Sequence, residues 1–219
     1  MKFVLALIPF IFTISVVAAP VVVSESVGQA GDRVITSREV QISAVLEKII
    51  EPPKANAKNL NALYESRPGD KNFSSDVTAL LLETVAHLEA ESFDMSLVKE
   101  ADLKASIEKV EKAVRGKSYW DNLEVSDAEL KKMMERKILS KNFIKFKTDS
   151  MSSIITDQEA QGYYERNRAN FGNLPFPSFR DSIKSFLARQ QLQDRLRSWF
   201  EVIKRKYKVR NFLVEGNAK

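Results

Sequence analysis

The chain has 219 residues, of which 34 are basic and 29 acidic, with one histidine and no cysteine. This length fits one domain or a small pair of domains, and 44% hydrophobic residues are enough to build a folded core. The absence of cysteine excludes disulfides, thiolate nucleophiles and zinc–thiolate sites, and a single histidine excludes a multi-histidine metal centre.

Residues 1–18 have the pattern of a secretory signal peptide. Lys2 precedes an apolar run from Phe3 to Val17, and the small residues Ala18 and Ala19 follow. A charged start, an apolar middle and a small-residue cleavage zone predict export and cleavage after Ala18. The alternative is a retained membrane anchor, but a span needs about 20 apolar residues, which is longer than this run. We therefore expect an exported protein that has no membrane span after cleavage.

A β hairpin is predicted for residues 21–35, where β-branched residues flank a segment that contains two glycines. The first strand covers Val21–Val27, the turn covers residues 28–32, and the return strand covers Arg33–Ile35. Because an isolated two-stranded hairpin is marginally stable in water, we expect it to pair with a further strand.

Residues 37–170 are expected to form the central helices, with a polar loop over 54–72 and one helix over 96–114. The helix starts are predicted from capping residues, namely Thr36 with Glu39, Ser74 or Ser75, Ser126 with Glu129, and Thr156 or Asp157. Apolar residues at helical spacing predict the buried faces, among them Ile42, Val45, Leu46, Ile49, Val77, Leu80, Leu81, Val85, Leu103, Val110 and Val114.

The longest helix is predicted near the end of the chain, over residues 178–206. A closing strand is expected over residues 209–214, followed by a frayed tail over 216–219. The most economical arrangement pairs this strand with the N-terminal hairpin. The sequence therefore predicts a mainly α fold, in which residues 19–215 form one helical bundle with a small β sheet that joins the two ends of the chain.

The side chains offer little for catalysis. The sequence contains no nucleophile elbow, P-loop, dinucleotide-binding fingerprint or zinc motif. His87 lies next to a predicted buried stripe and is interpreted as a structural residue, and paired carboxylates such as Glu89 and Glu91 are typical of solvated helices. We expect no catalytic residue, no metal and no cofactor.

Three segments resemble the N-terminal chaperone region of the SurA-like periplasmic folding factors. They are GDRVITSREV after the first strand, ITDQEAQGYYERNRANF over residues 155–171, and FRDSIKSFLARQQLQDRLRSWFEVIKRKYKVRNFL over residues 179–213. The resemblance is weak between residues 52 and 126. It implies a helical peptide-binding domain of the SurA and trigger-factor type. The family often carries parvulin-type prolyl isomerase domains, and the Asp-x-Glu-x-x-x-Tyr-Tyr segment looks like the one that leads into them.

This chain departs from the family at the expected parvulin position. A parvulin domain needs on the order of 90 residues, far more than an ordinary connection between helices, and only Gly172–Ser178 separates the two matching segments. The resemblance then implies an ATP-independent chaperone for unfolded or nascent exported polypeptides, of the kind used in outer-membrane protein biogenesis. It would have no isomerase activity and no nucleic-acid partner. Two alternatives stay open: an interaction subunit that binds one folded envelope partner, with homodimerisation through exchanged helices, and an unfamiliar prolyl isomerase.

A chaperone of this kind needs adaptable apolar side chains to contact its clients. The expected client-binding residues are Tyr119, Trp120, Met133, Met134, Phe143, Phe146, Phe171 and Phe176, with Phe73 and Phe93 as further candidates. Trp120 and Phe176 are expected to be the most exposed, because each lies in a polar or proline-flanked connector. For most of these residues, core packing is the competing interpretation.

The C-terminal segment is strongly basic. From Arg180 to Arg210 it contains ten basic and three acidic residues. A solvated helix face is the simplest interpretation of such a charge run. If clients bind, these cations would attract acidic segments and speed their encounter, and the residues expected to do so are Arg189, Arg195, Arg197 and Lys204.

Overall fold

The computed structural model describes residues 24–52, 66–95 and 98–216. Several predicted segments lie outside the described residues. They are the signal peptide, the start of the first strand at residues 21–23, most of the polar loop and the end of the tail. Within the described part, the chain is mainly helical with one small antiparallel sheet, which confirms the predicted fold class.

The elements are named in chain order. They are β1 (Ser26–Ala30), β2 (Arg33–Thr36), α1 (Ser37–Ile50), α3 (Phe73–Ser92), α4 (Glu100–Val114), α5 (Ser118–Asp121), α6 (Asp127–Met151), α7 (Asp157–Arg166), the 3-10 turns η1 (Arg168–Phe171) and η2 (Phe176–Ser178), α8 (Arg180–Lys206), β3 (Arg210–Asn211) and α9 (Phe212–Gly216).

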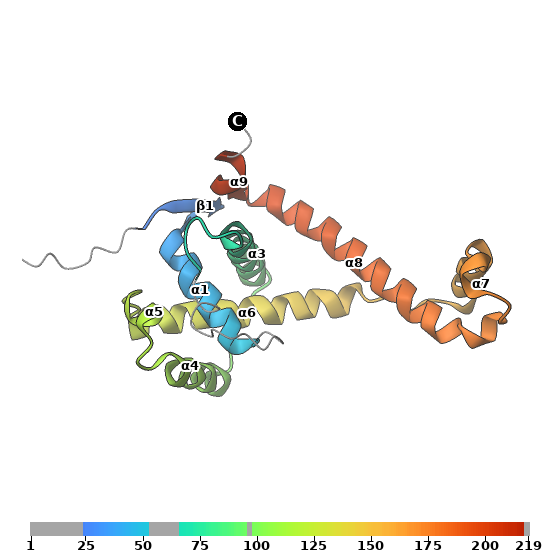
Figure 1. Cartoon of the computed structure of the whole chain (residues 1–219), viewed down its shortest axis with the longest axis horizontal. Coiled ribbons are helices and arrows are strands. Elements are labelled where there is room, and N and C mark those ends of the chain that lie inside the picture. Colours follow the sequence, from blue (N-terminus) through green and yellow to red (C-terminus); the bar gives the residue numbers. More distant parts are fainter. Residues whose placement is uncertain (1–23, 53–65, 96–97, 217–219) are drawn as a thin grey trace, which may run out of the picture.

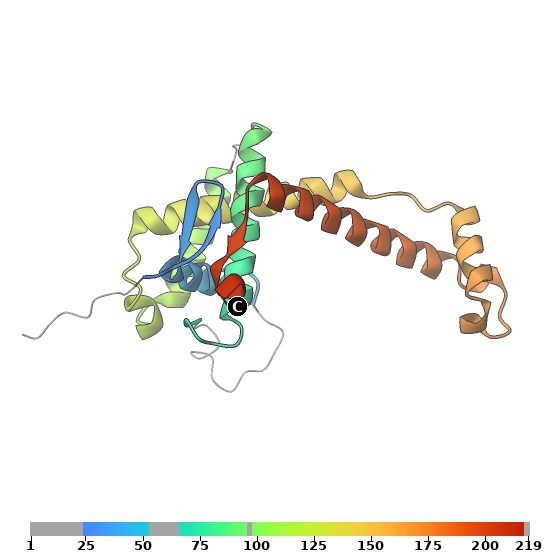
Figure 2. The ribbon, with the colours of Figure 1, turned by 90° about the horizontal axis from the view of Figure 1, so that it is seen from above.

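The molecule has a body and an arm (Figure 1). The sheet, α1, α3, α4, α5 and most of α6 form the body. The arm consists of α8 and the end of α6, and it carries α7 with the two 3-10 turns at its far end, which we call the tip. Seen from above, the arm projects well beyond the body (Figure 2).

The sheet has the strand order β2-β1-β3, with both pairings antiparallel. The two ends of the domain therefore meet, as predicted. The predicted turn over residues 28–32 is wrong, because β1 continues through Gly28 to Ala30 and the turn is shorter. Gly31, with φ of +60°, supplies the backbone conformation that this two-residue turn requires. The predicted closing strand over 209–214 is also too long, since β3 has two residues and α9 follows.

Gly28 has a packing role in the strand. A Cβ atom at this position would lie 2.9 Å from the carbonyl oxygen of Arg210 and 3.1 Å from a methyl group of Leu81. The glycine thus allows β3 and α3 to approach β1 closely. A glycine in a sequence can therefore mark a close contact within a strand as well as a turn.

The predicted helix starts are largely confirmed. Thr36 and Ser126 accept hydrogen bonds from the third backbone N–H of α1 and α6, and Thr156 forms a complete capping box with Glu159. The boxes at α1 and α6 are incomplete, because their glutamates form ion pairs with arginines instead. The predicted cap at Ser74 or Ser75 is wrong, since α3 begins at Phe73 without a side-chain cap.

Three cores hold the described part of the body together, and a separate one holds the tip. The first body core joins α1, α4, α5 and α6, and the second joins the sheet, α3 and the C-terminal end of α8. The smallest body core joins α3 and α6 through Ala86, Ala90, Leu139 and Phe143. The tip core consists of Ile155, Ala160, Tyr164 and Ile183, with aromatic rings packed around it. No helix in the described part of the chain is both long and apolar enough to cross a membrane.

The helix α8 bridges the body and the tip. It has 27 residues, which corresponds to about 40 Å at 1.5 Å per residue. Only Ile183 and Ile203 are fully buried along it. Between these points, Arg195 donates to the carbonyl of Met151 and Ser153 donates to Gln191, so polar contacts tie the middle of α8 to the end of α6 and the segment after it.

Candidate functional site

The eight predicted client-binding residues lie in three separate places. Tyr119, Met133 and Met134 are buried in the first body core, so the structure favours core packing for them. Trp120 is half-buried against the same core, and its predicted exposure is wrong. The reason is that the expected connector folds as α5, which packs both aromatic side chains toward α1, α4 and α6.

An aromatic cluster lies where α8 leaves the body, and we call it the root cluster. It consists of Phe93 after α3, Phe143, Phe146 and Lys147 on α6, and Trp199 on α8. The ring of Phe143 is central, with centroid distances of 5.6 Å to Phe93, 6.3 Å to Phe146 and 5.9 Å to Trp199. Phe143 is fully buried, but Phe93 and Phe146 are 51% and 46% exposed. The root cluster therefore presents two aromatic side chains to solvent around a packed ring.

Lys147 covers this cluster. Its Nζ atom lies 4.9 Å from the ring centroid of Phe93, 5.9 Å from that of Phe143 and 5.8 Å from that of Trp199. Residues 143, 146 and 147 share one face of α6, because side chains three and four positions apart are neighbours on a helix. Such contacts between an ammonium group and ring faces are electrostatically favourable.

The tip carries the second group of aromatic residues, the tip cluster. Phe171 contacts the rings of Tyr163, Tyr164 and Phe179, and Phe176 contacts Tyr164. Phe171 and Phe176 are half-buried, so the predicted high exposure of Phe176 is wrong. The most exposed apolar side chains on and next to the tip are Ile154, Leu174 and Phe186.

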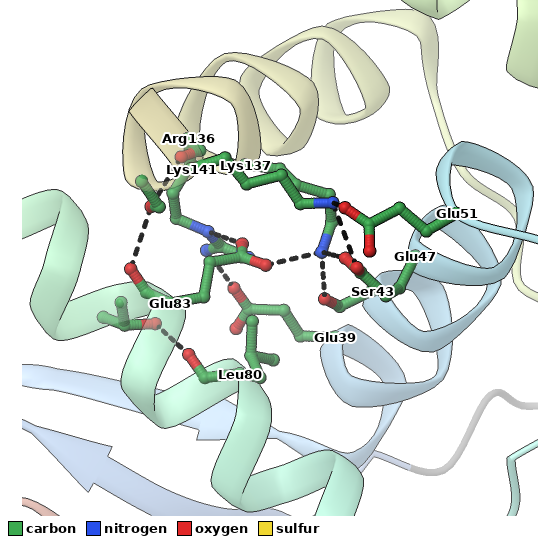
Figure 3. Close-up of polar contacts among 11 residues, drawn as sticks. Glu39, Ser43, Glu47, Glu51, Leu80, Glu83, Arg136, Lys137 and Lys141 are labelled. Atoms are coloured by element: carbon green, nitrogen blue, oxygen red, sulfur yellow. Dashed lines mark hydrogen bonds and ion pairs between the residues drawn. The ribbon is translucent and has the colours of Figure 1, made fainter. Parts of the chain in front are cut away.

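A buried ionic network fixes α6 against α1 and α3 (Figure 3). Arg136 contacts Glu39 at 2.6 Å and Glu83 at 3.0 Å, and Lys137 contacts Glu83 and Glu47. Burial would lower the pKa of Arg136, but the two carboxylates beside it outweigh burial and raise its pKa. The guanidinium of Arg136 therefore stays charged, and the ion pairs of Arg136 and Lys137 tie three helices of the body together.

Two cavities flank this network. The first, of about 330 Å³, has a mainly apolar floor that includes Leu80, Leu82 and Phe200. The second, of about 630 Å³, is lined by charged residues and His87. Burial, followed by the nearby arginines, lowers the pKa of His87 against the effect of Glu91. In the described part of the chain, no three His, Asp or Glu residues are grouped closely enough to hold a metal ion.

The predicted cations of α8 have different surroundings. Lys204 pairs with Glu201 at 2.6 Å, and Arg195 donates to the backbone of α6. Arg189 and Arg197 are exposed, and within the described ranges no carboxylate pairs with them. The most enclosed cation beside an aromatic surface, Lys147, is on α6 and was missed by the sequence prediction.

Sequence reasoning found some exposed residues and missed others. Phe146 and the further candidate Phe93 are exposed, as contact with a client would require, whereas the candidate Phe73 is fully buried. Trp199 is half-buried and shared between the second body core and the root cluster. The Phe-x-x-Phe-Lys spacing of α6 was the signal that could have identified Lys147.

The comparisons with known proteins give no assignment. No protein-family model matches the chain, and no curated protein or solved structure matches it. The functional argument therefore depends on the arm, its exposed apolar side chains and the charges beside them.

Proposed function

We propose that this protein is an exported, ATP-independent chaperone that binds unfolded or partly folded polypeptides without isomerase activity. The observation that carries the proposal is the exposure of large apolar side chains along the arm, namely Phe93 and Phe146 at the root and Ile154, Leu174 and Phe186 towards the tip. Exposed apolar side chains that lie close together are typical of interaction sites, and at the root Phe93 and Phe146 both pack against Phe143.

The shape of the arm supports an extended client rather than a compact ligand. Apolar side chains at the root and at the tip lie at different positions along a helix about 40 Å long, calculated from its 27 residues. An unfolded chain can contact both regions because it has no fixed shape. Ordering such a chain opposes binding, so we expect weak and reversible complexes.

The ionic network supports the same proposal because it holds α6, which carries part of the exposed surface, in a fixed position. Without such support, exposed aromatic side chains would pack against one another or against the body. Arg136 and Lys137 hold α6 against α1 and α3, and α6 carries Phe143 and Phe146 at its other end. The body therefore keeps the root cluster open and in place.

The proposal includes no isomerase step. The segment between α7 and α8, from Asn167 to Phe179, is occupied by η1, η2 and their short connection. The resemblance to SurA-like folding factors implies a chaperone region of this kind, and it remains part of the proposal. The homodimer is a prediction that size measurement in solution would check.

Suppression of aggregation tests this function. The mature protein is mixed with an unfolded test protein at near-stoichiometric ratio, and light scattering is followed over time. We expect suppression by the wild type, and the double variant Phe93→Ser/Phe146→Ser should need about fivefold more protein for the same effect, since it loses apolar contact area. Val34→Thr is the matched control, because Val34 is 49% exposed but lies on β2, away from the arm.

Two results would contradict the proposal. One is wild-type protein that does not slow aggregation at any ratio. The other is a double variant that remains folded and fully active. A single folded partner that co-purifies, without binding to generic unfolded chains, would favour the interaction-subunit alternative instead, for which the compact tip cluster offers a surface.

A further inference from the structure

We infer that the root cluster selects client segments in which an acidic side chain lies beside a large apolar one, and that Lys147 is the residue that pairs with the acid. This inference rests on the proposed chaperone function and names the class of client. It is carried by the surroundings of Lys147, which differ from those of the neighbouring lysines Lys141 and Lys145 on the same helix.

The neighbouring lysines of α6 already have carboxylate partners. Lys145 pairs with Asp149 at 2.9 Å, and Lys141 pairs with Glu47 at 3.0 Å and Glu51 at 2.7 Å. Lys147 is half-buried, and no carboxylate among the residues that the structure describes pairs with it. Its partners are the faces of Phe93, Phe143 and Trp199.

The acidic residues at the nearby end of α3 do not supply Lys147 with a carboxylate partner. Glu89 pairs with Lys206, and Glu91 lies 3.4 Å from His87. Asp94 follows Phe93 directly, but in the described structure no ion pair joins it to Lys147. The ammonium group is thus available to a charge that comes from outside the molecule.

Ring faces leave part of the bonding capacity of an ammonium group unused. A lysine has three N–H donors, and a ring face attracts the positive charge without offering a lone pair of the strength of a carboxylate oxygen. An ion pair formed beside aromatic rings is also less screened than one in open solvent. A client carboxylate at Lys147 would therefore bind while an adjacent apolar side chain packs between Phe93 and Phe146.

A second cation lies further along the arm. Arg195 is one helical turn from Trp199 on α8, and its guanidinium contacts the carbonyl of Met151, four residues after Lys147. Arg195 therefore adds a second positive charge on α8, beside the end of α6.

Matched peptides test the inference. Three labelled peptides share one Phe- and Leu-containing sequence and carry Asp, Asn or Lys at the two flanking positions, and fluorescence anisotropy at low salt gives their affinities. We expect the Asp peptide to bind about three- to tenfold more tightly than the Asn peptide, and the Lys peptide to bind most weakly. Added salt should reduce the difference between the three.

Two variants assign the preference to Lys147. Lys147→Gln should remove most of the preference for the Asp peptide, and Lys147→Glu should favour the Lys peptide. Lys145→Gln is the matched control, because Lys145 lies on the same helix but pairs with Asp149, and it should keep the preference. Circular dichroism and thermal melting confirm that each variant is folded.

The outcomes separate this inference from the proposed function. If the wild type suppresses aggregation but binds the Asp and Asn peptides equally, or if Lys147→Gln retains the preference, the inference is wrong and the chaperone function stands. If the wild type neither binds any peptide nor suppresses aggregation, the proposed function itself has failed.

Discussion

The ionic network between α1, α3 and α6 gives the sharpest prediction about stability. Glu83 is its centre, because its carboxylate accepts from Arg136 at 3.0 Å and from Lys137 at 2.5 Å. The Glu83 side chain is 12% exposed and those of the two cations are 4% exposed. Replacing Glu83 by glutamine keeps the volume and removes the charge, so it leaves two buried cations with reduced compensation.

The size of the stability loss depends on the carboxylates that still pair with Arg136 and Lys137 after the substitution. Removing one partner of a buried ion pair costs about 3–5 kcal/mol. Arg136 retains Glu39 and Lys137 retains Glu47, so we expect Glu83→Gln to cost about 3 kcal/mol, at the low end of this range. For a chain of this size that corresponds to a decrease in melting temperature of roughly 6–12 °C.

Urea unfolding followed by circular dichroism measures this cost, with an unchanged slope as the sign that the same surface unfolds. Glu51→Gln is the matched control. Glu51 pairs with Lys141 at 2.7 Å, but its side chain is 68% exposed, so we expect a cost below about 1 kcal/mol. The reasoning fails if Glu83→Gln is within 1 kcal/mol of the wild type, or if both variants lose the same amount.

Three further predictions follow from packing and charge. Gly28→Ala should destabilise the protein by about 1–3 kcal/mol in urea unfolding, because the new Cβ meets a carbonyl oxygen of β3 at 2.9 Å. Burial alone would raise the pKa of Glu47, but Lys137 and Lys141 outweigh burial and hold this pKa below its ordinary value of 4.5. The ion pairs of Glu47 therefore stabilise the fold above about pH 4.5, and this stabilisation is lost in more acidic solution. The difference in melting temperature between wild type and Glu47→Gln should therefore shrink from pH 7 to pH 3, and a constant difference would contradict it. Trp120→Ala should lower the free energy of unfolding by about 2 kcal/mol, since the half-buried ring packs on the first body core. An unchanged free energy of unfolding would instead support the exposed connector that the sequence predicts.

Much of the fold could be predicted from local signals. The positions of Thr36, Ser126 and Thr156 identify three helix starts, since a capping side chain acts within one turn of its own residue. The meeting of the chain ends was also predictable, because a lone hairpin lacks stability. Gly28 was misassigned for a physical reason: glycine permits both a turn and a close contact, and only the position of α3 and β3 decides between them.

The candidate site was harder to predict, because exposure depends on where distant helices pack. Phe143 and Phe146 are three residues apart on one helix, but the first is fully buried and the second is 46% exposed. The difference arises because Phe93 and Trp199, from the ends of α3 and α8, surround Phe143. No periodicity within α6 contains that information.

Buried charge is the other feature that the sequence concealed. Arg136 and Lys137 follow Met133 and Met134 on α6, and a charged pair in a helix ordinarily predicts a solvated face. Here the carboxylates that compensate them come from α1 and α3, more than fifty residues earlier in the chain. Burial of the two cations therefore depends on tertiary pairing that local patterns do not encode.

The helix α6 connects the stability of the body to the proposed activity. Its first half is fixed by the ionic network, and its second half carries Phe146 and Lys147. Because a helix transmits position along its axis, loosening the first half should also disturb the arrangement of the root cluster. A folded variant with a weakened network, such as Glu83→Gln below its melting temperature, should then bind the Asp peptide less selectively although no residue at the cluster has changed. If its selectivity equals that of the wild type, the network stabilises the body without positioning the root cluster.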